Sequence, residues 1–436
     1  MTTRFLILQK TFKMRPFSDI KKKYKYIVLQ KLVIASILIG FLSSFLALTL
    51  KRTTEYYETI FFHKSIVSPW LLIVFPVFGL SIIYFLRIYL FKGKSNKGIK
   101  EVFEVTKNKN KNLPIYKVPS HFINGLLTVA FGGSTGIEVS TVVATATIGS
   151  IAQRKENTFR KYKSELIGAG VAAGITALFG SPLAGIFFVI EVISKKKTKA
   201  FFLTIGISIL IATGLLHLLD EAPLFPIHNI TWNYYAIPYF ILLGILAGLN
   251  SVYITKTVMF LKSIFAKLNN DYHKVLIGSA ILSLSLLFFP QLYGDGYHAM
   301  RALLHTDATV SFTLLLSTLA IILLKPIITS VTLAAGGDGG VFAPSLFAGA
   351  FLGFLLATIL NTYFHAEVIP INFMILGMAA VLSASIHAPF TSLFLICGAT
   401  GSYTLFIPIL VVCLIAKYTS KYIYPYTVYS IIPTTK

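Results

Sequence analysis

Five long apolar runs decide what this chain can fold into. They are Leu32 to Leu50, Ser65 to Leu86, Phe201 to Leu219, Val275 to Gly294 and Val368 to Ala416, and none contains Asp, Glu, Lys or Arg. A helix of about 18 or more apolar residues is long enough to cross a bilayer. Only 13% of all residues are charged, whereas a soluble domain carries about 25%. A water-soluble globule is therefore excluded, and we expect an integral membrane protein.

Basic connecting segments predict how the chain crosses the membrane, because short loops rich in lysine and arginine face the cytoplasm. The basic segments are Met1 to Tyr26, Lys92 to Lys117, Arg154 to Lys163, Lys195 to Lys199, Lys256 to Lys274 and the tail from Lys417. The lysine-poor connections, expected outside, are Asp220 to Tyr234 and Asp295 to Asp307. These loops explain the net charge of +23 better than a nucleic-acid surface does. We expect a basic cytoplasmic tail over 1–26, a membrane domain over 27–430 and a short C-terminal tail over 431–436.

Two apolar stretches have basic segments at both ends, so each should leave the cytoplasmic side and return to it. Both are too short for the two membrane crossings that this requires. Residues 118–153 and 164–194 have basic segments at both ends and contain 36 and 31 residues, whereas two crossings need about 40. The second stretch is interrupted by Gly180-Ser181-Pro182. We expect pairs of short or broken helices, which are tolerated at membrane depth only inside protein or around a watery cavity. The alternative is an ordinary hairpin with a proline kink.

An internal repeat favours the broken helices. Gly132-Gly133-Ser134-Thr135-Gly136-Ile137-Glu138 is echoed by Gly336-Gly337-Asp338-Gly339-Gly340-Val341-Phe342, at an offset of 336 − 132 = 204. Ser181-Pro182-Leu183-Ala184-Gly185 is echoed by Ala388-Pro389-Phe390-Thr391-Ser392, at an offset of 389 − 182 = 207. Two matches in the same order at nearly the same offset indicate a duplicated half. Glycine-interrupted segments at corresponding positions of two halves are the sequence signal of a transport site.

The glycine-rich repeats have the composition of anion sites. Glycines let the backbone approach a ligand, and the free amides at a helix N-terminus attract anions without a full charge. We expect an anion to meet the amides of Val341 and Phe342. Glu138 lies at the same place in the first repeat, 154 − 138 = 16 positions before the next charged residue. A carboxylate at such depth is functional by default, and burial should raise its pKa. A dipole-stabilised first-turn acid is the alternative.

These residues resemble the CLC family of chloride channels and proton/chloride antiporters, over roughly Leu32 to Tyr429. The stretch Gly340-Val341-Phe342-Ala343-Pro344 is similar to the family's GxFxP segment, and Gly136-Ile137-Glu138 is similar to its glutamate gate. The resemblance implies that Tyr429 donates its hydroxyl to the central anion, although an interfacial tyrosine is the simpler interpretation of the residue itself. It also implies an all-α polytopic fold with two inverted-topology repeats, roughly 27–219 and 235–430, and a homodimer.

The departures from the family pattern concern selectivity and proton coupling. Val139-Ser140 replaces the Gly-Pro that follows the family's gate. At the inner end of the pathway, Lys97 takes the position of the selectivity serine, ahead of Gly98 and Ile99. The lysine either attracts anions or is one of many solvated lysines. Val192 takes the position of the internal proton-relay glutamate, so this relay is absent.

The function that we expect is transport of chloride or a related small anion, channel-like or weakly coupled. Glu191, beside the missing relay, is interpreted as a salt-bridged helix-end residue, and a substitute relay is its alternative role. Proton-coupled antiport of chloride or fluoride is the alternative function, and a transport-inactive scaffold or sensor is a further one. Under each of these hypotheses we expect a multi-pass protein of a bacterial inner membrane with both termini in the cytoplasm. We expect neither an enzyme nor a metal or cofactor, because the apolar runs contain no metal-ligating set and no nucleophile beside a base.

Overall fold

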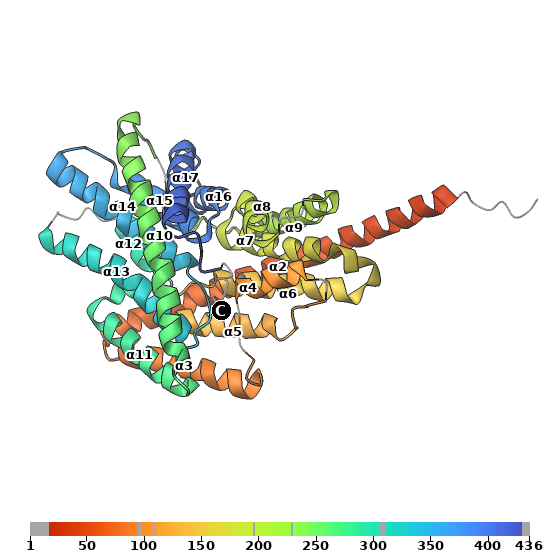
Figure 1. The fold of residues 1–436 in the computed structure, drawn as a ribbon, viewed down its shortest axis with the longest axis horizontal. Helices are drawn as coiled ribbons and strands as arrows, with labels where there is room; N and C mark the ends of the chain where they lie inside the picture. The colour runs from red at the N-terminus through yellow and green to blue at the C-terminus, as the bar shows by residue number, and fades with distance from the viewer. Residues whose placement is uncertain are drawn as a thin grey trace, which may run out of the picture.

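The computed structural model describes residues 17–94, 98–108, 110–194, 197–227, 230–304 and 311–429, with side chains from residue 25 onward. These residues form sixteen α-helices, α2 to α17, and no β-strand (Figure 1). Eight of the described helices are long and apolar enough to cross a membrane. The prediction of an all-α polytopic membrane fold is therefore confirmed.

The helices fall into two sequential groups. The first contains α2 (Phe17–Val67), α3 (Leu71–Phe85), α4 (Ile99–Lys107), α5 (Lys117–Ala130), α6 (Glu138–Lys155), α7 (Lys163–Phe179), α8 (Pro182–Phe188) and α9 (Lys199–Leu218). The second contains α10 (Ile237–Ala266), α11 (Asp271–Phe288), α12 (Tyr297–Leu304), α13 (Phe312–Ala334), α14 (Phe342–Phe364), α15 (Pro370–Ile386), α16 (Pro389–Thr400) and α17 (Phe406–Ile423). Figure 1 shows α6 to α9 on one side of the molecule and α11 to α14 on the other.

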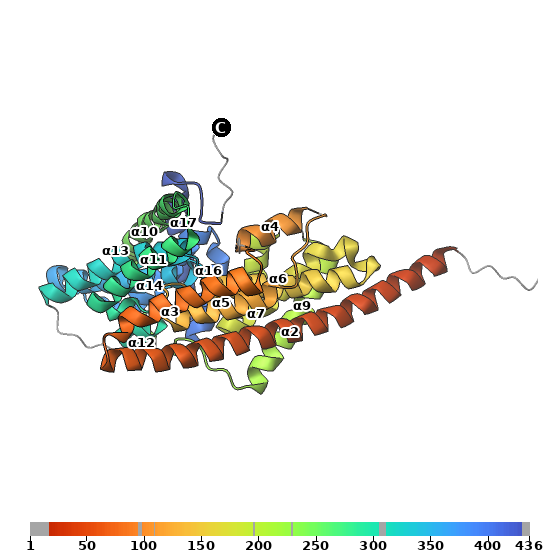
Figure 2. The same cartoon turned by 90° about the horizontal axis from the view of Figure 1, so that it is seen from below.

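Helix α2 is the longest element and runs along one face of the molecule, as Figure 2 shows in red. Its 51 residues span about 77 Å at 1.5 Å per residue, more than twice the thickness of a bilayer core. It begins at Phe17, inside the segment predicted to be a tail. The basic end of the chain is therefore partly continuous with the first membrane helix.

The expected broken helices are present in both stretches. Residues 118–153 are divided between α5 and α6, and residues 164–194 between α7, α8 and a π-helical turn, Val189–Ile193. The break before α8 is closed by Ser181, whose hydroxyl accepts the Ala184 N–H (3.3 Å) and donates to the Phe394 carbonyl (2.7 Å). Every residue of α7 is buried. At the break itself Ser181 is buried, whereas Gly180 is exposed, so the interrupted backbone lies only partly inside protein.

The two glycine-rich repeats meet at the centre of the fold. Gly136 and Gly340 form an antiparallel bridge, in which the Gly136 N–H donates to the Gly340 carbonyl at 3.5 Å. The Thr135 hydroxyl donates to the Asp338 carbonyl at 3.2 Å. Asp338 itself pairs with buried His121 (Oδ2 to Nδ1, 2.8 Å), which fixes the second repeat. As a result, α6 and α14 begin side by side.

Candidate functional site

Glu138 is the first residue of α6 and is almost completely buried. Its Oε1 accepts a hydrogen bond from the Tyr297 hydroxyl at 2.6 Å. The carboxylate also faces the backbone amides of Glu138 itself and of Ala343, near the start of α14. A Cβ atom on Gly136 would overlap both the Glu138 carboxylate and the Ala343 side chain, so only glycine leaves room for this arrangement. The carboxylate therefore lies where an anion would meet the N-termini of α6 and α14.

The second repeat supplies the neighbouring part of the site. Val341 precedes α14 and Phe342 begins it. The Phe342 ring stacks on Phe179 with centroids 5.7 Å apart, so the side chain packs into the core and only the backbone faces an anion. A Cβ atom on Gly340 would lie 3.2 Å from the Tyr429 hydroxyl, which also lies against the backbone amide of Val341. Tyr429 is thus beside the second repeat, although about 90 residues separate them in sequence.

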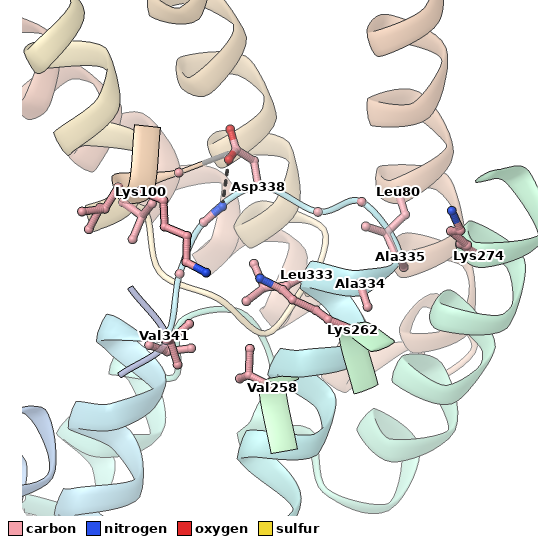
Figure 3. A pocket seen from close by; sticks show the side chains of 18 of the residues that line it. Leu80, Lys100, Val258, Lys262, Lys274, Leu333, Ala334, Ala335, Asp338 and Val341 are labelled. Atoms are coloured by element: carbon pink, nitrogen blue, oxygen red, sulfur yellow. Dashed lines mark hydrogen bonds between the residues drawn. The ribbon is translucent and has the colours of Figure 1, made fainter. Parts of the chain in front are cut away.

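A cavity of about 540 Å³ opens from this point (Figure 3). Its lining includes five of the predicted site residues, namely Gly98, Ile99, Gly340, Val341 and Tyr429. Arg87, Lys100, Lys262 and Lys274 also line it. Figure 3 shows the Lys100 and Lys262 side chains extending toward one another in the cavity, close enough for their charges to repel. The cavity therefore has a positive wall that attracts anions.

Neutralising Lys262 tests this electrostatic contribution. At separations of about 8 Å in water, one charge changes the local anion concentration about two- to threefold. We expect Lys262→Met to lower anion flux by about that factor at low ionic strength, because the cavity then concentrates anions less. At high salt the difference should vanish through screening. Flux measured at both ionic strengths, with Lys267→Met as an α10-end control outside the cavity lining, checks this expectation. An unchanged flux at low ionic strength would show that Lys262 does not contribute to the anion pathway.

On its other side, Glu138 borders a space of only about 20 Å³, roughly the room of one water molecule. The lining of this space includes Lys51 and Glu55 from α2, together with Asp295 and Tyr297. Lys51 is also paired with Glu221 (3.1 Å) in the connection expected to lie outside. Glu138 thus lines this small space, which we call the outer space because Glu221 belongs to a connection expected outside, and the next residue, Val139, lines the wide cationic cavity.

The remaining residues singled out in the sequence are Lys97, Val192 and Glu191, of which the structure describes the last two. Lys97 lies outside the described residues, and Gly98, which follows it, caps α4 with φ +62°. Val192 lies half-buried in the π-helical turn after α8. Glu191 accepts the Thr391 N–H (2.8 Å) and hydroxyl (2.7 Å) at the start of α16. This carboxylate therefore caps a helix of the second group, and the described residues show no ion pair for it.

No sequence pattern predicted a role at the site for Tyr297, Lys262 or the buried Lys325. Lys325 lies in a long apolar segment, 325 − 307 = 18 positions after Asp307 and 338 − 325 = 13 before Asp338. The isolation that singled out Glu138 would have singled out this lysine as well. Tyr297 carries no comparable signal, because the chain contains 22 tyrosines.

A family model described as voltage gated chloride channel matches residues 78–421 of this chain. The voltage-gated ClC-type chloride channel ClcB of Escherichia coli O17:K52:H18 (strain UMN026 / ExPEC) is 29% identical over 309 residues, which cover 70% of this chain and 72% of the relative. ClcB of Escherichia coli strain K12 / DH10B matches with the same identity and coverage.

Solved structures with the same fold include transporters. A slow cyanobacterial Cl⁻/H⁺ antiporter superposes with a TM-score of 0.79 at 21% identity, covering 92% of this chain and 96% of the other. A CLC-type fluoride/proton antiporter gives 0.77 at 24% identity, covering 92% and 97%. A eukaryotic CLC transporter gives 0.76 at 17% identity, covering 92% and 73%. At these identities the similarity establishes the fold alone.

Proposed function

This chain belongs to the voltage gated chloride channel family, and we propose that it moves chloride or a related small anion along a pathway that Glu138 closes. Family membership confirms the prediction of anion transport across a membrane. One observation supports the gate. The Glu138 carboxylate lies at the joined N-termini of α6 and α14 and lines the outer space, while the next residue, Val139, lines the cationic cavity.

In the proposed mechanism the ionised Glu138 occupies an anion site and blocks it. When the carboxylate is protonated or displaced, an anion takes its place beside the amides of Val341 and Phe342. It then passes the Tyr429 hydroxyl and reaches the cavity lined by Lys100 and Lys262. Backbone dipoles and a hydroxyl carry only partial charges, so an anion is bound strongly enough to enter and weakly enough to leave. Lys97 remains a proposed contributor to selectivity.

The proposed orientation puts the cationic cavity on the cytoplasmic side of a bacterial inner membrane, with both termini cytoplasmic. Its lining residues Arg87, Lys100, Lys262 and Lys274 lie within or next to the basic segments 92–117 and 256–274, which supports this assignment. We further propose a homodimer in which each subunit has its own pathway.

Chloride release from proteoliposomes tests the proposed function. Vesicles loaded with chloride are diluted into chloride-poor solution, and valinomycin with potassium sets the voltage. We expect release far above that of protein-free vesicles. Release no faster than from protein-free vesicles, in both the native protein and Glu138→Gln, would support the hypothesis of a transport-inactive scaffold or sensor instead.

Proton-coupled exchange is the second candidate, because Glu138 is a protonatable group within the pathway. The inner part of a proton route has Val192 where family antiporters carry a glutamate, and Glu191 is engaged in capping α16. We therefore expect little or no uphill proton movement when chloride flows outward from weakly buffered vesicles, followed by external pH. Proton movement that begins with chloride flux, stops in Glu138→Gln and survives voltage clamping would show an antiporter.

A further inference from the structure

The short segment of residues 292–297, which we call the outer loop, is held by two buried carboxylates. Glu58 of α2 accepts the backbone N–H of Asp295 at 3.3 Å. Asp295 in turn accepts the N–H of Tyr297 at 2.8 Å. Glu58 and Asp295 are both almost completely buried. The backbone on each side of Gly296 is therefore fixed by an acidic side chain.

A buried lysine holds the same loop from the opposite side. The Lys325 ammonium donates to the carbonyls of Leu292 (3.2 Å) and Gly294 (3.1 Å), and it lies 4.6 Å from the centroid of the Phe347 ring of α14. Gly294 and Gly296 both have positive φ, +58° and +87°. A Cβ on Gly294 would overlap the Glu58 carboxylate, and one on Gly296 would overlap the Phe347 ring. The loop is thus fitted closely between α2, α13 and α14.

Three buried ionisable side chains, Glu58, Asp295 and Lys325, hold one six-residue loop, and this number requires an explanation beyond stability. Removing ionised groups from water is costly, and apolar side chains of similar volume often stabilise a fold equally well. Inside a membrane protein such groups usually serve the transport function. Tyr297 is the side chain of the loop that is hydrogen-bonded to the gate, since its hydroxyl donates to Glu138 at 2.6 Å. The three ionisable groups therefore have a common effect, which is to fix the position of this hydroxyl.

We propose that Tyr297 is a latch, which holds the ionised Glu138 in the anion site and which Glu58, Asp295 and Lys325 keep in position. This inference rests on the proposed gating role of Glu138. A hydrogen bond to an ionised carboxylate is about twice as strong as one between neutral groups. The latch therefore stabilises the closed, ionised gate more than the protonated gate, and Tyr297 is a positioning residue that acts through Glu138.

Other charged or titratable groups also face the gate and set its pH response together with the latch. They are Lys51 and Glu55 of α2, Asp295 of the outer loop, and Tyr429 near the chain end. None of these is changed by the substitution Tyr297→Phe, which removes one hydroxyl and keeps the ring. A shift in the pH profile of that variant therefore reports the latch.

The test compares chloride release from proteoliposomes over a range of pH for four proteins: the native chain, Tyr297→Phe, Glu138→Gln and the double variant. Loss of a hydrogen bond to a charged group corresponds to about a tenfold change. We expect Tyr297→Phe to raise release about tenfold at neutral pH and to move the midpoint of the pH profile upward by about one unit. Tyr293→Phe is the matched control, because its hydroxyl donates to the Ala130 carbonyl (2.8 Å) rather than to Glu138.

The double variant separates the latch from the gate. With Glu138→Gln already present, Tyr297→Phe should add nothing, because no ionised carboxylate remains to be held. Two results would contradict the proposed latch. One is a pH profile of chloride release in Tyr297→Phe that superimposes on the native profile, and the other is an equal rise in release when Tyr297→Phe is added to Glu138→Gln. If Glu138→Gln itself leaves both release and its pH response unchanged, the proposed gate fails, and the latch fails with it. A protein that loses release in Tyr293→Phe as well as Tyr297→Phe would show that the loop is purely structural.

Discussion

Replacing Glu138 by glutamine should raise anion flux about tenfold or more at neutral pH and abolish its pH dependence. The neutral amide imitates the protonated gate and loses its charge-assisted contacts, each worth about 1.5 to 3 kcal/mol. The closed state is then no longer favoured, and anions have free access to the amides of Val341 and Phe342. Chloride release from voltage-clamped proteoliposomes at several pH values measures both effects.

Glu55→Gln is the matched control for this experiment. Glu55 lines the same outer space as Glu138 but lies at its exposed end, 3.5 Å from Arg301. Its neutralisation should keep the flux pH-dependent and at most shift the midpoint, because the titrating group of the gate, Glu138, is still present. If Glu138→Gln keeps both the native flux and the native pH response, Glu138 does not gate the pathway.

Replacing Lys325 by methionine should produce the largest loss of stability among the single substitutions considered. The change removes the only ammonium that contacts the outer loop within the described residues, and leaves Glu58 and Asp295 buried together. Breaking a buried charge cluster in this way costs about 3 to 5 kcal/mol. Thermal unfolding of the purified protein in detergent, followed by the loss of monodisperse material, measures the effect.

Two further variants show whether charge or volume causes that loss. Lys51→Met should cost less than Lys325→Met, because Glu221 keeps its contact with Arg52, whose side chain is 51% exposed. Adding Glu58→Gln to Lys325→Met should recover part of the lost stability, since one uncompensated carboxylate is removed. Equal losses for Lys325→Met and Lys51→Met would contradict the assigned role of the charge cluster.

Much of the fold could be predicted because a bilayer imposes strict lengths. The stretches 118–153 and 164–194 were too short for two crossings, and Gly180-Ser181-Pro182 marked a break that α7 and α8 confirm. The start of α2 could not be predicted in the same way. Its first turns are rich in lysine, and charge patterning indicates which side of the membrane a segment faces rather than whether it is helical.

The site was only partly predictable because its contacts join distant segments. The offset of 204 between the repeats is the spacing between Gly136 and Gly340, which pair in the structure. Isolation in an apolar run identified Glu138. The tyrosine that contacts it lies 159 residues away, and no periodicity relates the two positions. The sequence therefore indicated which two backbone segments correspond and which carboxylate stands out between them, but not the tyrosine that contacts that carboxylate. The roles of Glu138, Val341, Phe342, Lys97 and Tyr429, and the division into two halves, remain predictions.

Anomalous diffraction from crystals grown in bromide tests most directly whether Glu138 occupies an anion site. Bromide is a heavy substitute for chloride, and its position can be located without reference to flux. In Glu138→Gln we expect a bromide ion at the N-termini of α6 and α14, where the native carboxylate lies, and a second ion beside the Tyr429 hydroxyl. In the native protein only the second should appear. Crystals of Glu138→Gln with no bromide at the position of the native carboxylate would contradict the proposed gate.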